Sequence, residues 1–265
     1  MLNDGNFIGF YSLGKDYDYM SNWYPAGFKY AGKSFISSEQ FMMYQKMMTF
    51  GQYKIALDIM KTPDPQECKS LGRTPIRNWD SVLWDRIRYV VVKRGIRAKF
   101  FQNKDLLKSL LDTGDAILAE CSPTDRNWGI GLDSDDPARF DVNKWTGENL
   151  LGRALMEVRD EFTRLASISE KRLMESEFYD VHDINDLPFM KMSLNELLRI
   201  PKLHSSVDAY VSVCRRFGDV DMFDMSLDKL ENILRLSNDG SYPVQGFFEL
   251  KQDLYDIENG VFTLG

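Results

Sequence analysis

The first 35 residues alternate apolar and polar positions in short runs that suit β-strands. Aromatic and β-branched residues dominate residues 7–12 and 23–36, and glycine, proline and polar residues separate these runs. Runs of this kind, bounded by turn residues, are typical of short strands. The pattern therefore predicts a small N-terminal sheet.

After residue 37 the apolar positions change to helical spacing. Ser37 and Gln40 have the spacing of a capping box, which places a helix start at this point. Pro63 and Pro65 separate two short helices, because proline breaks a helix interior. The expected helices in this half of the chain cover residues 38–49, 52–60, 65–71, 79–101, 104–112 and 148–165.

The longest of these helices, 79–101, has one apolar stripe and a basic flank. The stripe, which we expect to face the core, consists of Leu83, Ile87, Val91 and Ala98. Three cations fall together on its flank, namely Arg86, Lys93 and Arg97.

The composition changes near residue 165, after a glycine- and aspartate-rich loop at about 121–147 and the helix that follows it. Four amphipathic helices are expected in the second part, at residues 169–178, 194–200, 206–217 and 226–236. The last stretch, 242–265, suits a hairpin or a docking tail, and we find no internal repeat. A boundary near 165–185 divides the chain into residues 1–165 and 166–265.

The formal net charge of −7 is unevenly distributed along the chain. Residues 1–165 hold 23 Lys+Arg and 22 Asp+Glu, whereas residues 166–265 hold 10 and 18. A nearly neutral first part suits a small anionic ligand but not the large basic footprint of a nucleic-acid-binding protein. The acidic second part suits solvation or a basic protein partner. A DNA-binding regulator is therefore the least favoured class.

Several other classes are excluded by what the chain lacks. No stretch approaches the roughly 20 apolar residues of a membrane span, and the N-terminus has no secretory-signal pattern. Cys68, Cys121 and Cys214 are scattered without a C-x-x-C motif, which argues against disulfides or a zinc site and indicates a cytoplasmic location. Both histidines, His182 and His204, lie in the second part. Chemistry in the first part must therefore use carboxylates, lysine, hydroxyls or thiols.

Glu39 is the first candidate for such chemistry, because it lies in the first turn of the helix that begins after Ser37. The helix dipole favours the ionised form of a carboxylate at this position, by roughly 0.3–1 kcal/mol. An ionised carboxylate can stabilise a ribosyl cation with oxocarbenium character or orient a water molecule. The alternative is an ordinary glutamate that only supports the helix.

The segment 120–131 is the second candidate. Trp128 is followed by Gly129 and Gly131, and a W-G-x-G sequence can form a ligand-facing loop in which the indole stacks on a base. Asp125 and Glu120 add two carboxylates nearby. The alternative is a tight turn around a core tryptophan.

Basic residues form the third group. Arg73 lies in a turn, Arg97 and Lys99 lie near the end of the long helix, and Arg153 lies early in the helix that closes the first part. Arginine and lysine suit phosphate contacts, although each of these side chains is explained equally simply as solvated surface charge. No Walker loop or dinucleotide fingerprint accompanies them.

Taken in order, several short motifs resemble the NADAR family, also described as YbiA-like, from about residue 7 to 162. They are F-Y-S at 10–12, M-S-N-W-Y-P at 20–25, S-S-E-Q-F-x-x-Y-Q-K at 37–46, L-G-R at 71–73, N-W-D at 78–80, R-A-K-F at 97–100, D-x-x-W-G-x-G at 125–131 and N-L-L-G-R-A-L-M-E-V-R at 149–159. The family often has histidine after the helix glutamate, where this chain has Gln40. Residues from 166 onward resemble nothing that we can name.

The resemblance implies an α+β fold that is mostly helical, with a small N-terminal sheet and here a helical C-terminal region. It also implies an N-glycosidase that needs no metal or cofactor. Some members act on early phosphorylated intermediates of riboflavin biosynthesis, and others remove ADP-ribose from guanine. The expected substrate is accordingly a small nucleotide or an ADP-ribosylated guanine.

The same resemblance, joined to the residue chemistry, suggests a role for each candidate. Glu39 would stabilise the cation or position water, and Asp125 would act as acid or orient the substrate. The expected substrate-binding residues are Ser21, Asn22, Arg73, Lys99, Trp128, Gly129 and Gly131, with Trp128 on the base and Arg73 and Lys99 on phosphate. The alternative function is a non-catalytic module that binds ADP-ribose or a related nucleotide, with residues 166–265 contacting a protein partner.

Overall fold

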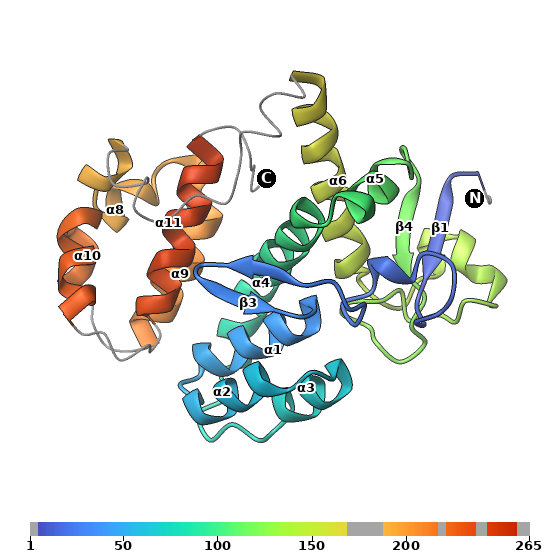
Figure 1. Cartoon of the computed structure of the whole chain (residues 1–265), viewed down its shortest axis with the longest axis horizontal. Coiled ribbons are helices and arrows are strands. Elements are labelled where there is room, and N and C mark those ends of the chain that lie inside the picture. Colours follow the sequence, from blue (N-terminus) through green and yellow to red (C-terminus); the bar gives the residue numbers. More distant parts are fainter. Residues whose placement is uncertain (1–4, 169–187, 217–220, 237–242, 259–265) are drawn as a thin grey trace.

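The computed structural model of the chain describes residues 5–168, 188–216, 221–236 and 243–258 (Figure 1). Its four strands are β1 (Phe7–Phe10), β2 (Phe28–Tyr30), β3 (Lys33–Phe35) and β4 (Ile117–Glu120). Its helices are α1 (Ser38–Thr49), α2 (Tyr53–Lys61), α3 (Pro65–Gly72), α4 (Ser81–Gln102), α5 (Lys104–Leu111), α6 (Leu150–Ile168), α8 (Leu194–Leu197), α9 (Pro201–Arg216), α10 (Leu227–Leu236) and α11 (Val244–Glu258). Within these ranges no helix combines the length and apolar composition needed to cross a membrane.

The expected α+β fold is confirmed, with the strands arranged as two separate pairs. The hairpin of β2 and β3 is antiparallel, with Phe28 opposite Phe35. The other pair joins β1 in parallel to β4, with Phe10 opposite Glu120. Our sequence analysis assigned no strand to residues 117–120, because four residues before a long loop give little local signal. Since parallel strands end at the same edge, Glu120 emerges beside the loop that follows β1.

Helix α4 runs through the centre of the molecule (Figure 1) and is buried far beyond its predicted stripe. The four stripe residues are buried as expected. Of the flanking cations, however, only Arg86 is largely exposed, while Lys93 and Arg97 are buried. Arg94, which lies between them in the sequence, is buried as well. Solvation therefore does not explain the basic flank, and each buried cation requires a partner.

The C-terminal region forms a second hydrophobic core of its own and also completes the first one. Ala209 and Val213 from α9 pack into the core of residues 10–162. Residues 244–258 form a helix, so the predicted hairpin is wrong. Phe247, Leu250 and Leu254 have helical spacing and are buried in the second core. The boundary predicted at 165–185 and the predicted helix 169–178 lie largely or wholly outside the described residues.

A short internal repeat is present in this region, contrary to our sequence analysis. The sequence Met-Ser-Leu-x-x-Leu occurs at 192–197 and again at 225–230, each time at the start of a helix. Ser193 and Ser226 form an antiparallel bridge, and the Leu227 amide donates to the Met192 carbonyl. The two copies therefore pack against each other as similar units.

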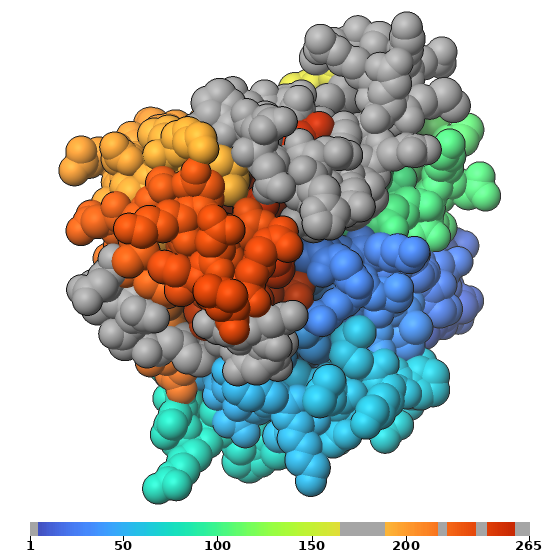
Figure 2. Space-filling view, turned by 60° about the vertical axis from the view of Figure 1, so that its left-hand side comes forward, coloured from blue at the N-terminus to red at the C-terminus, as the bar shows by residue number. Residues whose placement is uncertain are grey.

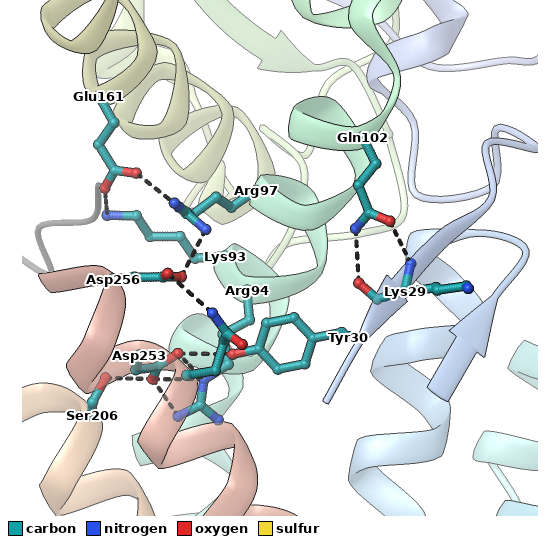
Figure 3. A network of polar contacts seen from close by, with 11 residues as sticks. Lys29, Tyr30, Lys93, Arg94, Arg97, Gln102, Glu161, Ser206, Asp253 and Asp256 are labelled. Carbon is teal, nitrogen blue, oxygen red and sulfur yellow. Dashed lines mark hydrogen bonds and ion pairs between the residues drawn. The ribbon is translucent and has the colours of Figure 1, made fainter. Parts of the chain in front are cut away.

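Carboxylates of α11 are partners of the two buried arginines in α4, whereas the buried lysine pairs with α6 (Figure 3). Asp253 accepts hydrogen bonds from Arg94 at 2.6 Å, from the Tyr30 hydroxyl at 2.8 Å and from Ser206 at 2.5 Å. Asp256 accepts one from Arg97 at 2.9 Å. Figure 2 shows the orange and red C-terminal segments lying directly against the blue N-terminal ones. Part of the acidity of residues 166–265 is thus neutralised within the chain.

We expect Asp253→Asn to lower the free energy of unfolding by at least about 2 kcal/mol, because among the described residues it leaves the buried Arg94 with Glu249, at 3.6 Å, as its one ion-pair partner. Urea denaturation measures the change. The matched control is Asp112→Asn, which breaks an ion pair with Lys108 at 2.7 Å on the surface and should cost less than about 1 kcal/mol. Equal effects of the two substitutions would contradict this account of the interface.

Candidate functional site

Two adjoining cavities, of about 430 and 240 Å³, lie where the first helices meet the ends of β1 and β4. We call them together the site pocket. Residues from four separate segments line both cavities, namely Trp23, Lys69, Arg73, Glu120 and Asp125. Ser21 lines the larger cavity, and Asn22, Glu39 and Trp128 line the smaller one. The pocket therefore collects most of the predicted site residues.

The start of α1 places Glu39 at the pocket. The Ser37 hydroxyl accepts from the Gln40 amide at 3.2 Å, as the capping spacing predicts, and the Glu39 amide donates to the Asn22 carbonyl at 2.8 Å. The Gln40 side chain points elsewhere and donates to the Thr62 carbonyl at 3.0 Å. Gln40 thus ties α1 to the end of α2, and Glu39 is left to face the cavity.

Glu39 is buried, with 2% of its surface exposed, and burial raises the pKa of its carboxyl to about 7. Lys69, Arg73 and a hydrogen bond from Trp23 act against this rise, and Asp125 adds to it. Among the described residues, Glu39 Oε1 has no hydrogen-bond partner. The helix start therefore does not hold the pKa of Glu39 at its ordinary value, because desolvation outweighs the helix dipole.

Glu120 is a second buried carboxyl in the same pocket. Its pKa is raised to about 8, mainly by burial and also by the nearby charges of Asp125 and Glu39, while Lys69 acts in the opposite direction. Within the described part of the chain, Glu120 Oε2 also lacks a hydrogen-bond partner. Our sequence analysis noted Glu120 only as a neighbour of Asp125, because its place at the end of a strand was not predicted.

Asp125 is bound into the loop that carries Trp128. Its Oδ1 accepts from the amides of Asn127 at 2.9 Å and Trp128 at 2.8 Å, and its own amide donates to the Ser122 hydroxyl at 3.2 Å. Trp128 packs partly against the hydrophobic core and lines the smaller cavity. The structure thus combines the two alternatives for this tryptophan: it is a core residue that also borders the pocket.

Gly129 and Gly131 do not line either cavity of the site pocket. A Cβ on Gly129 would lie 2.8 Å from the Glu120 carbonyl, and a Cβ on Gly131, where φ is +72°, would lie 2.2 Å from Thr146 Oγ1. Both glycines therefore allow the loop to pack closely against its own backbone and neighbours.

Lys99 lies beneath the pocket rather than in it. Its Nζ donates to the carbonyls of Tyr19 at 2.7 Å and Ser21 at 2.9 Å, and burial lowers its pKa to about 7. Our sequence analysis placed Lys99 on phosphate, but its ammonium group is turned to the backbone of the loop that carries Ser21, Asn22 and Trp23. This placement gives Lys99 a role in positioning that loop.

Lys69 joins the predicted Arg73 as a second cation at the pocket. In the described ranges, no carboxylate lies within ion-pair distance of either side chain, and the Lys69 ammonium lies 5.2 Å from the centre of the Trp23 ring. Their separation of four residues places both on one face of α3, and this spacing was the signal that could have identified Lys69. Trp23 was also missed, although it lies inside the M-S-N-W-Y-P motif.

Comparison with known proteins supports the resemblance seen in the motifs. The NADAR domain matches residues 9–163. An N-glycosidase of Acanthamoeba polyphaga mimivirus is 41% identical over 146 residues, which cover 53% of this chain and 85% of that protein. A riboflavin biosynthesis protein of Vibrio vulnificus is 31% identical over 169 residues, which cover 64% of this chain and 42% of that protein.

The solved structure of the Escherichia coli protein YbiA is similar to this fold, with a TM-score of 0.52 and 29% sequence identity over 64% of this chain and 91% of that one. Curated relatives from several organisms are named N-glycosidases, which confirms the expected class of enzyme, a hydrolase of N-glycosyl bonds. From the motifs, the fold and these matches, the chain belongs to the NADAR family.

Proposed function

We propose that this chain hydrolyses the bond between the C1′ carbon of a phosphorylated ribose and a nitrogen of a guanine or aminopyrimidine base. One observation carries the proposal: the site pocket holds buried carboxyl groups beside aromatic rings and two cations that have no ion-pair partner in the described part of the chain. A carboxylate can stabilise the cationic ribose carbon, the cations can bind phosphate, and the rings can stack on the base.

Glu39 has the position required for the ribose carbon. As the C1′–N bond breaks, its electron pair goes to the base nitrogen and positive charge develops on the ribose. A carboxylate desolvated by burial interacts with that charge more strongly than one in water. Water then bonds to C1′ and gives a proton to Glu39, whose pKa of about 7 suits a base at neutral pH.

Lys69 and Arg73 are suited to the phosphate group. Both line the two cavities, and no carboxylate of the described chain lies within ion-pair distance of either, so both can contact a bound anion. Trp23 and Trp128 border the smaller cavity, where a flat base can stack. The combined size suits a small nucleotide, since pockets for small molecules are commonly about 300–1,000 Å³.

The riboflavin-pathway intermediate and ADP-ribosylated guanine remain the two candidate substrates. The name of the Vibrio vulnificus relative supports the first. ADP-ribose carries two phosphates and a second ribose, so it must extend further out of the pocket, toward the exposed Arg73.

We expect the full chain to release the base from one of these two substrates, and Glu39→Gln to lower the turnover at least about 100-fold. Mass spectrometry of the released base and sugar phosphate measures both. Glu67→Gln on the exposed side of α3 is the matched control and should keep wild-type turnover. Absence of release from both substrates, with tight binding of ADP-ribose, would instead favour the non-catalytic binding module.

The burial of Glu39 should cost stability in the wild-type protein. Its raised pKa means that the folded state holds the proton more tightly than the unfolded state, so stability falls as pH rises from about 4.5 to about 7. Above that range, we expect Glu39→Gln to raise the free energy of unfolding by an amount on the order of 3 kcal/mol.

Urea denaturation at pH 5 and pH 8 measures this difference. Glu67→Gln should change the free energy of unfolding by less than about 1 kcal/mol at either pH. The idea that Glu39 is retained for chemistry at the expense of stability fails if Glu39→Gln is less stable than the wild type at pH 8.

A further inference from the structure

Glu120 has the surroundings of a catalytic group, and the proposed function gives it no role so far. It stands at the end of β4, lines both cavities of the site pocket, and has a buried Oε2 without a partner in the described chain. A buried polar oxygen without a hydrogen bond is costly to the fold. Because the Glu120 residue lines the pocket, we expect a bound ligand to supply the missing partner.

The three carboxyl groups of the pocket have different neighbours. Glu39 receives a hydrogen bond from Trp23 and is favoured in its charged form by both Lys69 and Arg73. Glu120 has only Lys69 in its favour, while Asp125 and Glu39 both disfavour its charge. Because a charge on Glu39 disfavours a charge on Glu120, the proton is held more firmly by Glu120, which has the weaker cationic support.

Asp125 is the other group that our sequence analysis considered for the acid. Its Oδ1 already accepts two backbone hydrogen bonds and holds the loop of Trp128 in place. That use suits an oriented acceptor, which helps to place the substrate, better than a donor of protons.

We propose that Glu120 is the catalytic acid that protonates the leaving base, while Glu39 acts on the ribose carbon. The proposal rests on the proposed N-glycosidase function. As the C1′–N bond breaks, the electron pair moves to the base nitrogen, which takes the proton from the Glu120 carboxyl. Water bonds to C1′ and gives a proton to Glu39. Solvent then returns a proton to Glu120 and removes one from Glu39, so the enzyme is restored.

The raised pKa of Glu120, about 8, agrees with an acid that is protonated at neutral pH. It also predicts the sign of the pH dependence. The wild-type kcat should fall as pH rises above about 8, because Glu120 then loses the proton that it must donate.

The test compares the wild type, Glu120→Gln and Glu39→Gln on two substrates. The first has a neutral base and is whichever of the riboflavin-pathway intermediate and ADP-ribosylated guanine the wild type cleaves faster. The second is 7-methylguanosine 5′-monophosphate. The methylated base is already cationic and leaves without a proton. We expect Glu120→Gln to lower kcat about 100-fold or more on the neutral base but less than about 10-fold on the methylated one. Glu39→Gln should lower both alike, and Glu120→Gln should lose the fall in kcat above pH 8.

Three results would overturn the assignment. In the first, Glu120→Gln keeps the kcat of the wild type. In the second, Glu120→Gln lowers kcat equally on both substrates and leaves the pH profile of kcat unchanged. In the third, Glu120→Gln regains activity at high pH. If the wild type does not cleave the methylated nucleotide, the pH profile alone decides. Failure of the wild type on every substrate would instead refute the proposed function, and circular dichroism of each variant separates loss of chemistry from loss of fold.

Discussion

The burial of charged side chains along α4 is the constraint on which the rest of the structure depends. A cation removed from water is costly unless a counter-charge and hydrogen bonds replace the water. Lys93 lies 2.8 Å from Glu157 of α6, and Arg94 and Arg97 bind Asp253 and Asp256 of α11. The Lys93 ion pair holds α6 against α4, and the two arginine ion pairs hold α11 against it. The N-terminal and C-terminal parts of the chain are therefore joined by charge as well as by their shared apolar core.

The same helix also supports the functional site. Lys99, near the end of α4, holds the carbonyls of Tyr19 and Ser21, and the next residue, Asn22, accepts from the Glu39 amide. A chain of hydrogen bonds thus leads from the buried helix to the carboxyl that faces the pocket. The two regions use burial in opposite ways, because α4 satisfies its charges whereas the pocket leaves Glu39 and Glu120 each with an unpartnered oxygen. A bound substrate can then supply the partners that these two oxygens lack in the described chain.

Local signals in the sequence account for what could be predicted. The capping serine and the apolar spacing gave the start of α1 correctly, and Glu39 followed from it. The motif around Trp128 likewise located a pocket residue. The pairing of β1 with β4, the burial of Lys99 and the meeting of Arg94 with Asp253 depend on segments up to 159 residues apart. No local pattern carries that information, so cations that seemed to be solvated or phosphate-binding proved to be structural.

The central claim is that burial gives this pocket two carboxyl groups whose protonation lies in the range useful for catalysis. Carbon-13 NMR of protein labelled at the glutamate side-chain carboxyls measures it directly, with Glu39→Gln and Glu120→Gln to assign the signals. We expect each variant to lose one signal, and the lost signal should titrate near pH 7 for Glu39 and near pH 8 for Glu120. Titration of both signals near the ordinary value of 4.5 would contradict it.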